Sequence, residues 1–121
     1  MTQEEKKLLL KDLCARLPYN VKVDFSNTEC ILSNIGSDGS IYLLKNDKKA
    51  IYTTNIQYIK PYLHPMSSMT EEEKIDFQSF FNYDGIEYPE EYIDWLNAHH
   101  IDYRGLIEKG LALEAPNGMY N

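Results

Sequence analysis

The spacing of apolar residues predicts a helix at the start of the chain. Leucines and a cysteine recur at three- and four-residue intervals with lysines between them, which is the pattern of an amphipathic helix. Thr2 stands three residues before Glu5, the spacing of a capping box. Pro18 should end the helix, because the residue before a proline leaves the α region. We therefore expect a helix over residues 1–17, with Cys14 on its buried face.

After this helix the period of the apolar residues changes to that of a strand. Val21, Val23 and Phe25 alternate with charged residues, as in a strand with one buried face. Turn-forming clusters separate further short apolar runs. The strands expected cover residues 21–25, 29–35, 41–44 and 50–54. They should form a four-stranded antiparallel meander, which either closes into a small Sm-like or Src-homology-3-like barrel or lies as an open sheet against the helices.

A second helix is expected after the strands. Residues 55–63 should first form one helical turn and an extended exit, because prolines limit any longer helix there. Thr70 then precedes Glu73 by three residues, with glutamates throughout the first turn, which indicates a capped helix start. The turn Tyr83-Asp84-Gly85 should end this helix. Its expected apolar stripe consists of Phe77, Phe80 and Phe81.

The remaining residues predict further helix and a loose tail. Pro89 suits the first position of a helix, which would run to His99. Asp102 could cap a last short helix that ends at Gly110. Residues 116–121 are expected to be loosely held.

Length and composition favour one α+β domain. The chain has 121 residues and a mass of 14.1 kDa, enough for one core without disulfides or metal. We interpret residues 1–121 as a single domain, with a helix over 1–17, a β unit over 18–66 and an acidic helical region over 67–121. No apolar run is long enough to span a membrane. Two cysteines and no secretory signal predict a cytoplasmic protein.

Charge is uneven along the chain. Residues 1–66 carry nine basic and seven acidic residues, whereas residues 67–121 carry three basic and twelve acidic ones. An acidic surface repels phosphates, so nucleic-acid binding is disfavoured. A local exception is the lysine cluster Lys45, Lys48 and Lys49. A small β barrel could bind nucleic acid through Lys22, Lys45, Lys48, Lys49 and Lys60, which would then converge beside Tyr42 or Tyr52. The acidic half could instead imitate nucleic acid, which predicts one continuous face of Glu71, Glu72, Glu73, Glu87, Glu90, Glu91 and Asp94.

One polar cluster could carry chemistry. The chain has no Gly-rich phosphate loop, Cys-x-x-Cys or helical His-Glu-x-x-His motif. His99, His100, Asp102 and Arg104 lie within six residues, but adjacent histidines on a helix point about 100° apart and rarely share an ion. We therefore expect no metal, no cofactor and no enzyme activity, and a structural ion pair for Arg104. An enzyme would need a histidine of the cluster in a pocket with Asp102 or Arg104.

Tyrosine is unusually frequent, at ten residues, seven of them after position 55. A tyrosine combines a rigid apolar ring with a polar tip and so suits contact surfaces. The residues expected to contact a partner are Tyr92, Trp95, Tyr103 and Tyr120. With no catalytic signature present, these residues predict a non-catalytic module that binds another protein.

Several segments also resemble a known group of proteins. They are residues 8–19 (LLLKDLCARLPY), 60–63, 65–73, 99–107, 110–112, 114–116 and 119–120. Together they are similar to short uncharacterised proteins of Bacteroides-type gut bacteria and of their phages and mobile elements. The resemblance implies a cytoplasmic protein that serves a phage or mobile element as an accessory. That group has no assigned activity, so the resemblance assigns no functional residue.

Overall fold

The computed structural model describes residues 1–45, 50–82, 85–86 and 89–120. The chain begins with helix α1 (Gln3–Arg16), which has the predicted capping box. The Thr2 hydroxyl accepts a hydrogen bond from the Glu5 amide at 3.1 Å, and the Glu5 carboxylate accepts one from the Thr2 amide at 2.8 Å. A single 3-10 turn, η1 (Leu17–Tyr19), follows the helix. The predicted first helix is therefore confirmed.

The buried face of α1 differs from the prediction at one position. The helix buries Leu9, Asp12, Leu13 and Arg16, whereas Cys14 is exposed. Successive helical residues are about 100° apart, so this buried face turns Cys14 toward solvent. The assignment of Cys14 to the core was wrong, because the apolar pattern does not reveal that an aspartate and an arginine are buried in its place.

The predicted strands form the expected antiparallel meander, and a further strand joins it. They are β1 (Lys22–Phe25), β2 (Thr28–Ile35), β3 (Ile41–Lys45) and β4 (Ile51–Thr54). The predicted helical turn is η2 (Ile56–Tyr58), but the extended exit is a paired strand, β5 (Ile59–Pro65), antiparallel to β1. Strand β5 also pairs with two short strands from later in the chain, and this pairing begins only at Tyr62. Pro61 therefore lies where one side of β5 has no partner among the described strands, a position that proline tolerates.

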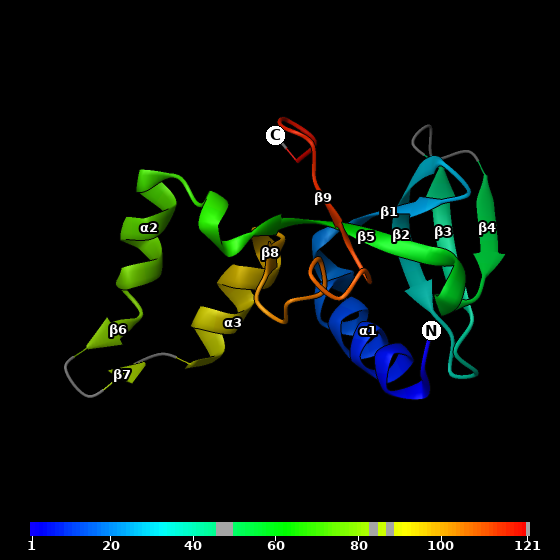
Figure 1. The fold of residues 1–121 in the computed structure, drawn as a ribbon, viewed down its shortest axis with the longest axis horizontal. Helices are drawn as coiled ribbons and strands as arrows, with labels where there is room; N and C mark the ends of the chain where they lie inside the picture. The colour runs from blue at the N-terminus through cyan, green and yellow to red at the C-terminus, as the bar shows by residue number, and fades with distance from the viewer. Residues whose placement is uncertain (46–49, 83–84, 87–88, 121) are drawn as a thin grey trace.

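The sheet is open (Figure 1). Its order is β4-β3-β2-β1-β5-β8, and β9 also pairs with β5. The two short strands β8 (Ile101–Asp102) and β9 (Leu113–Glu114) run parallel to β5. Across the described residues β4 pairs with β3 alone, so the barrel alternative is wrong and the open sheet is correct. The turn expected at 46–47 lies outside those residues.

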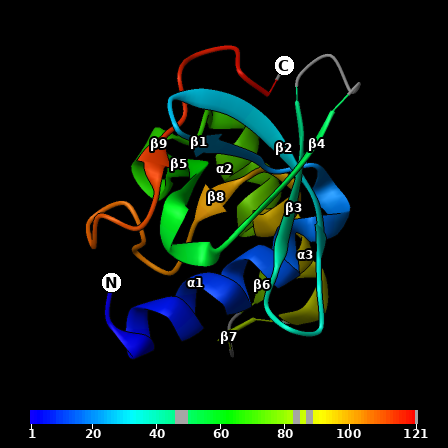
Figure 2. The same ribbon diagram turned by 90° about the vertical axis from the view of Figure 1, so that its right-hand side faces the viewer.

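Alternation along the strands separates an inner and an outer face of the sheet. On the inner face, α1 places Leu9 and Leu13 against the sheet (Figure 2). The strands contribute Val23, Cys30, Leu32, Ile41, Leu43, Ile59 and Leu63 to this core, and Val21 joins it just before β1. The register places one row of neighbours on the outer face, Lys22, Ile31, Leu44 and Ile51. We call α1 and the sheet the sheet body.

Helix α2 (Glu71–Gln78) begins as predicted and ends early. Its capping box is present, with the Thr70 hydroxyl accepting from the Glu73 amide at 3.1 Å. The helix stops at Gln78, and a small hairpin follows, β6 (Phe81–Asn82) and β7 (Gly85–Ile86). Phe80 and Phe81 therefore lie beyond the helix on which they were predicted. Helix α3 (Pro89–Ala98) starts at the predicted proline.

The last part of the chain holds the largest departures. No helix forms over the described residues 103–120, and the expected short helix is a series of turns. The Asp102 carboxylate accepts from the amides of Leu106 and Ile107, both at 2.9 Å, while Gly105 and Gly110 adopt positive φ. The tail is also held rather than loose: the Tyr120 hydroxyl donates to the Tyr62 carbonyl at 2.7 Å. None of the described helices is long and apolar enough to cross a membrane.

Candidate functional site

One candidate contact surface is the unit formed by α2, the β6–β7 hairpin and α3, which we call the aromatic arm. It lies at one end of the molecule, opposite β4 (Figure 1). Helix α2 buries none of its residues. Its Phe77 ring instead contacts the rings of Phe81, Tyr92 and Trp95, with centroids 5.2, 5.4 and 6.0 Å away. Phe80 completes the cluster, 6.3 Å from both Tyr92 and Trp95.

The aromatic arm leaves apolar side chains open to solvent. Ile75 is 67% exposed, Phe81 39% and Ile93 37%. The described part of the arm also carries exposed carboxylates, which are Glu71, Glu72, Asp76, Glu90, Glu91 and Asp94. The lysine of α2, Lys74, lies 3.4 Å from Glu71. Exposed apolar side chains together with charged ones are found at protein interfaces.

The base of the arm is anchored at α3. Leu96 is fully buried and packs with Met69 and Ile101 in a second apolar cluster. The Trp95 ring stacks on His99 with centroids 4.1 Å apart, and the His99 Nδ1 donates to the Trp95 carbonyl at 2.9 Å. These contacts fix the orientation of Trp95 without burying it completely.

A buried ionic network joins α1 to the segment that follows the arm. Asp12 and Arg16 are both fully buried, with Arg16 Nε donating to Asp12 at 2.8 Å. Arg16 also donates to the Ile101 carbonyl at 2.7 Å. Arg104 forms the ion pair expected of it, donating to Asp12 at 3.1 Å, and the Tyr103 ring lies beside both guanidinium groups.

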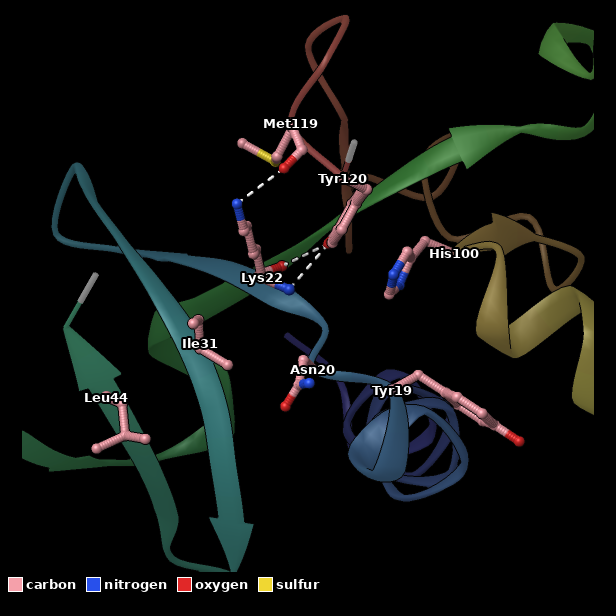
Figure 3. Close-up of a pocket in the computed structure, with 8 residues that line it drawn as sticks. All are labelled: Tyr19, Asn20, Lys22, Ile31, Leu44, His100, Met119 and Tyr120. Atoms are coloured by element: carbon pink, nitrogen blue, oxygen red, sulfur yellow. Dashed lines mark hydrogen bonds between the residues drawn. The ribbon is translucent and has the colours of Figure 1, made fainter. Parts of the chain in front are cut away.

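A second candidate site lies where the tail crosses the outer face of the sheet. Two cavities, of about 410 and 530 Å³, share His100 and Tyr120 as walls. These two rings stack with centroids 3.6 Å apart at an angle of 17°. The smaller cavity is drawn in Figure 3 and lies against β1, β2 and β3. The larger one is lined by all three histidines, including His64 and His99.

His100 is an unusual residue of this site. Its side chain is buried, its backbone has a φ of 58°, and its Nδ1 has no hydrogen-bond partner among the described residues. Burial, followed by the positive charge of Arg16, lowers the pKa of His100 to about 4. The ring is therefore neutral near pH 7. Burial likewise raises the pKa of the Tyr120 phenol, whose hydroxyl also accepts from the Lys22 amide at 2.8 Å.

The structure separates the predicted polar cluster. His99 and His100 line cavities, but Asp102 and Arg104 line neither of the two cavities. The carboxylate of Asp102 is occupied by two backbone amides, and Arg104 by Asp12. Among the described residues no group of histidine, cysteine or acidic side chains is arranged to hold a metal ion.

The residues predicted to contact a partner fall into separate regions. Tyr92 and Trp95 lie together in the aromatic arm. Tyr103 belongs to the ionic network, and Tyr120 to the cavities. The four residues therefore form no single surface.

The structure describes most of the charged residues on which the mimic and nucleic-acid alternatives depend. The acidic residues predicted on one face lie on α2 and α3, except Glu87, which is outside the described residues. Lys45 lies 5.8 Å from the centre of the Tyr52 ring. Lys48 and Lys49 are also outside the described residues.

Sequence reasoning missed several residues of these sites. Asp12 and Arg16 stand four positions apart on α1, and this spacing could have suggested their pairing. Lys22 occupies an outward position of β1, but nothing local indicates that the tail meets it. Comparison with protein-family models, with curated proteins and with solved structures finds no match for this chain.

Proposed function

We propose that this protein is a non-catalytic binding module for another protein and that the aromatic arm contacts the partner. The observation that carries the proposal is the arrangement of α2, which buries none of its residues while its rings pack on α3. Ile75, Phe81 and Ile93 are exposed on the same two helices and hairpin. Aromatic side chains at the centre of a contact surface, with a polar rim, are typical of binding hot spots.

The charge of the arm defines the chemistry of the partner. Exposed carboxylates lie on both helices that carry the exposed apolar side chains, so a complementary surface combines apolar and basic groups. An amphipathic helix with a stripe of apolar residues between lysines or arginines has this character and can lie along two helices. We propose such a basic amphipathic helix of a partner protein as the occupant. Opposite charges would also steer the encounter.

The proposed setting is the cytoplasm of a bacterial host, where the protein would serve a phage or mobile element. The sequence resemblance supports this setting. Both cysteines are free thiols, which suits a reducing compartment.

A nucleic-acid mimic is the second candidate, because carboxylates are exposed on both α2 and α3. A mimic would use these charges and would not need the apolar side chains between them. Removing the apolar groups and reversing the charges therefore distinguish the two functions.

The first experiment removes exposed apolar side chains. Ile75→Ser with Ile93→Ser changes the arm, while Ile51→Ser with Tyr58→Ser removes side chains that are 65% and 61% exposed elsewhere. A tagged copy is cross-linked in a nuclease-treated host extract and the linked peptides are identified. The proposal expects cross-links from the arm to a basic amphipathic segment, lost in the arm variant and kept in the control. Cross-links that map elsewhere, or that survive in the arm variant, contradict it.

The second experiment reverses charge. Asp76→Lys with Asp94→Lys acts within the arm, and Glu108→Lys with Glu114→Lys makes the same change at exposed positions outside it. Binding to the identified partner should slow markedly for the arm variant and weaken as salt rises. If charge reversal abolishes binding and apolar removal has no effect, the mimic replaces the docking module.

A further inference from the structure

The hydroxyl group of Tyr120 takes the place of a ladder bond between β1 and β5. The paired register of these strands ends one residue before Lys22 and Tyr62 would face each other. The Val21 carbonyl bonds to β2, so the backbone groups of Lys22, one residue further on, point to β5. There the Lys22 amide donates to the Tyr120 hydroxyl at 2.8 Å, which in turn donates to the Tyr62 carbonyl at 2.7 Å. The phenol therefore joins the two strands where their own pairing stops.

The ring of Tyr120 and the peptide group before it have partners as well. The ring stacks on that of His100 with centroids 3.6 Å apart, and the His64 ring lies 5.8 Å away in a T-shaped arrangement. The Lys22 ammonium donates to the carbonyl of Met119 at 2.8 Å (Figure 3). All these contacts converge on one tyrosine. We call the residues that supply them the tyrosine seat: Lys22, Tyr62, His64 and His100.

The seat is selective for a phenol. A hydroxyl group offers one donor and two acceptor positions, and the seat uses a donor and an acceptor at the same oxygen. A phenylalanine in this place would leave the Lys22 amide and the Tyr62 carbonyl without that partner, which is costly for part-buried backbone groups. A site built to hydrogen-bond a hydroxyl rejects an analogue that lacks it.

The segment that delivers Tyr120 to the seat is weakly anchored. Residues 116–120, which we call the strap, include no buried residue. Before the strap, the chain is fixed at Ala115, which is 7% exposed and whose amide donates to the Leu63 carbonyl at 2.8 Å. The strap itself meets the sheet through Met119 and Tyr120. Such hydrogen bonds contribute little net stability in water, so the strap should open more often than the sheet unfolds.

There is space on both sides of the seat. The cavities of about 410 and 530 Å³ share Tyr120 and His100 as walls. A different segment that placed a tyrosine in the seat would therefore find room for its neighbouring residues.

We propose that the seat binds a tyrosine in an extended segment of another protein, and that the strap occupies the seat as a displaceable ligand from the same chain. The incoming tyrosine places its hydroxyl between Lys22 and Tyr62 and its preceding carbonyl at the Lys22 ammonium. The strap regulates the seat by competing for it. The seat lies outside the aromatic arm, so this inference stands independently of the proposed function.

The test is an NMR titration of the full chain carrying Tyr120→Ala, which empties the seat. The ligand is a peptide of residues 117–120, acetylated and amidated at its ends, and its analogue has phenylalanine in place of the tyrosine. A tethered strap has an effective concentration in the millimolar range, so both peptides are titrated to that range. The tyrosine peptide should shift the amides of Lys22, Tyr62 and His100 saturably and bind at least about tenfold more tightly than its analogue. No saturable shift, or equal affinities for the two peptides, overturns the proposal.

The matched control is Tyr58→Ala, because Tyr58 is 61% exposed and lines neither cavity. This variant keeps its strap in the seat. It should bind the tyrosine peptide at least about tenfold more weakly than Tyr120→Ala, since a site that is open for only part of the time has a lower apparent affinity. Equal binding by the two variants would place the peptide outside the seat and contradict the proposal.

Hydrogen exchange of the unaltered chain keeps the test decisive if Tyr120→Ala does not fold. The amides of Lys22 and Asp24 both point to β5, but that of Lys22 bonds to Tyr120, whereas Asp24 lies opposite Lys60 in the ladder. Opening of the strap should make the Lys22 amide exchange about tenfold faster than that of Asp24. Tyr120→Phe should speed Lys22 about fivefold further and leave Asp24 unchanged. Equal exchange of the two amides, or no change at Lys22 in Tyr120→Phe, would show that the strap does not open apart from the sheet and overturns the proposal.

Discussion

The sheet body and the aromatic arm use apolar residues in different ways. In the sheet body, Leu9, Leu13 and Leu43 are fully buried between α1 and the strands. In the arm, α2 buries none of its residues, and Ile75 is 67% exposed. Single exposed apolar residues are ordinary, but the arm exposes Ile75, Phe81 and Ile93, which supports the contact surface proposed above. The buried apolar side chains of the sheet body stabilise the fold, whereas the exposed ones of the arm are accessible from solvent.

The largest expected effect is at the buried ionic network of the sheet body. Asp12→Ala removes the carboxylate that accepts from both Arg16 and Arg104 and leaves the fully buried Arg16 without its charge partner. Breaking such a pair from one side costs about 3–5 kcal/mol of the free energy of unfolding. Urea denaturation measures the loss.

The matched variant in the arm is Glu71→Ala. Glu71 contacts Lys74 at 3.4 Å, and its side chain is 89% exposed, so water already screens the pair and no measurable loss is expected. If Asp12→Ala were as stable as Glu71→Ala, the ionic network would not support the sheet body.

The next effect compares apolar residues directly. Leu43→Ala empties a fully buried position of β3 and should cost about 2–5 kcal/mol. Ile75→Ala in the arm should stay within about 0.5 kcal/mol, the usual range for exposed positions. The same urea measurement compares them. A large loss for Ile75→Ala would mean that the arm's exposed residues are needed for folding, which would remove the basis of the proposed contact surface.

Local features of the fold could be predicted, and distant pairings could not. The capping boxes at Thr2 and Thr70 and the alternation of the first strands are visible within a few residues, and they were predicted correctly. Strand β5 and the tail were missed because their positions depend on partners far along the chain. Tyr92 and Trp95 lie three positions apart on the helix predicted at Pro89, so local spacing alone was enough to group these two residues.

The candidate cavity shows the same limit. His100 was singled out, but with Asp102 and Arg104, whose side chains turn to Leu106 and to Asp12 instead. The Arg104–Asp12 pair spans 92 positions. The other residues that line the smaller cavity come from β1, β2, β3, the tail and the Tyr19–Asn20 segment after α1, and no local pattern connects these segments.

A third effect concerns acid. The pKa of His100 is about 4 in the folded chain against an ordinary value of 6.5, so the unfolded chain binds a proton more readily. Stability from this residue is complete above pH 6.5 and is lost as the pH falls toward 4. The loss amounts to about 3 kcal/mol at most.

His100→Asn isolates this effect, because asparagine has no titratable group and tolerates the positive φ of 58°. Urea unfolding of both proteins at pH 7, 5.5 and 4.5 should show the stability difference between them shrinking as the pH falls. A difference that stays constant across this range would show that His100 titrates normally and is not buried as a neutral ring.

The smallest expected effect concerns the capping boxes at the starts of α1 and α2. Thr70→Ala removes the capping hydroxyl of α2 and Thr2→Ala that of α1, each costing about 1 kcal/mol of local helix stability. Because α2 has no buried residue, its opening should be local, so Thr70→Ala should speed hydrogen exchange in α2 about fivefold while the amides of α1 keep their protection. If Thr70→Ala instead lowered the protection of α1 and of the strands equally, the arm would unfold together with the sheet body, and its exposed rings would have to be counted as part of one cooperative core.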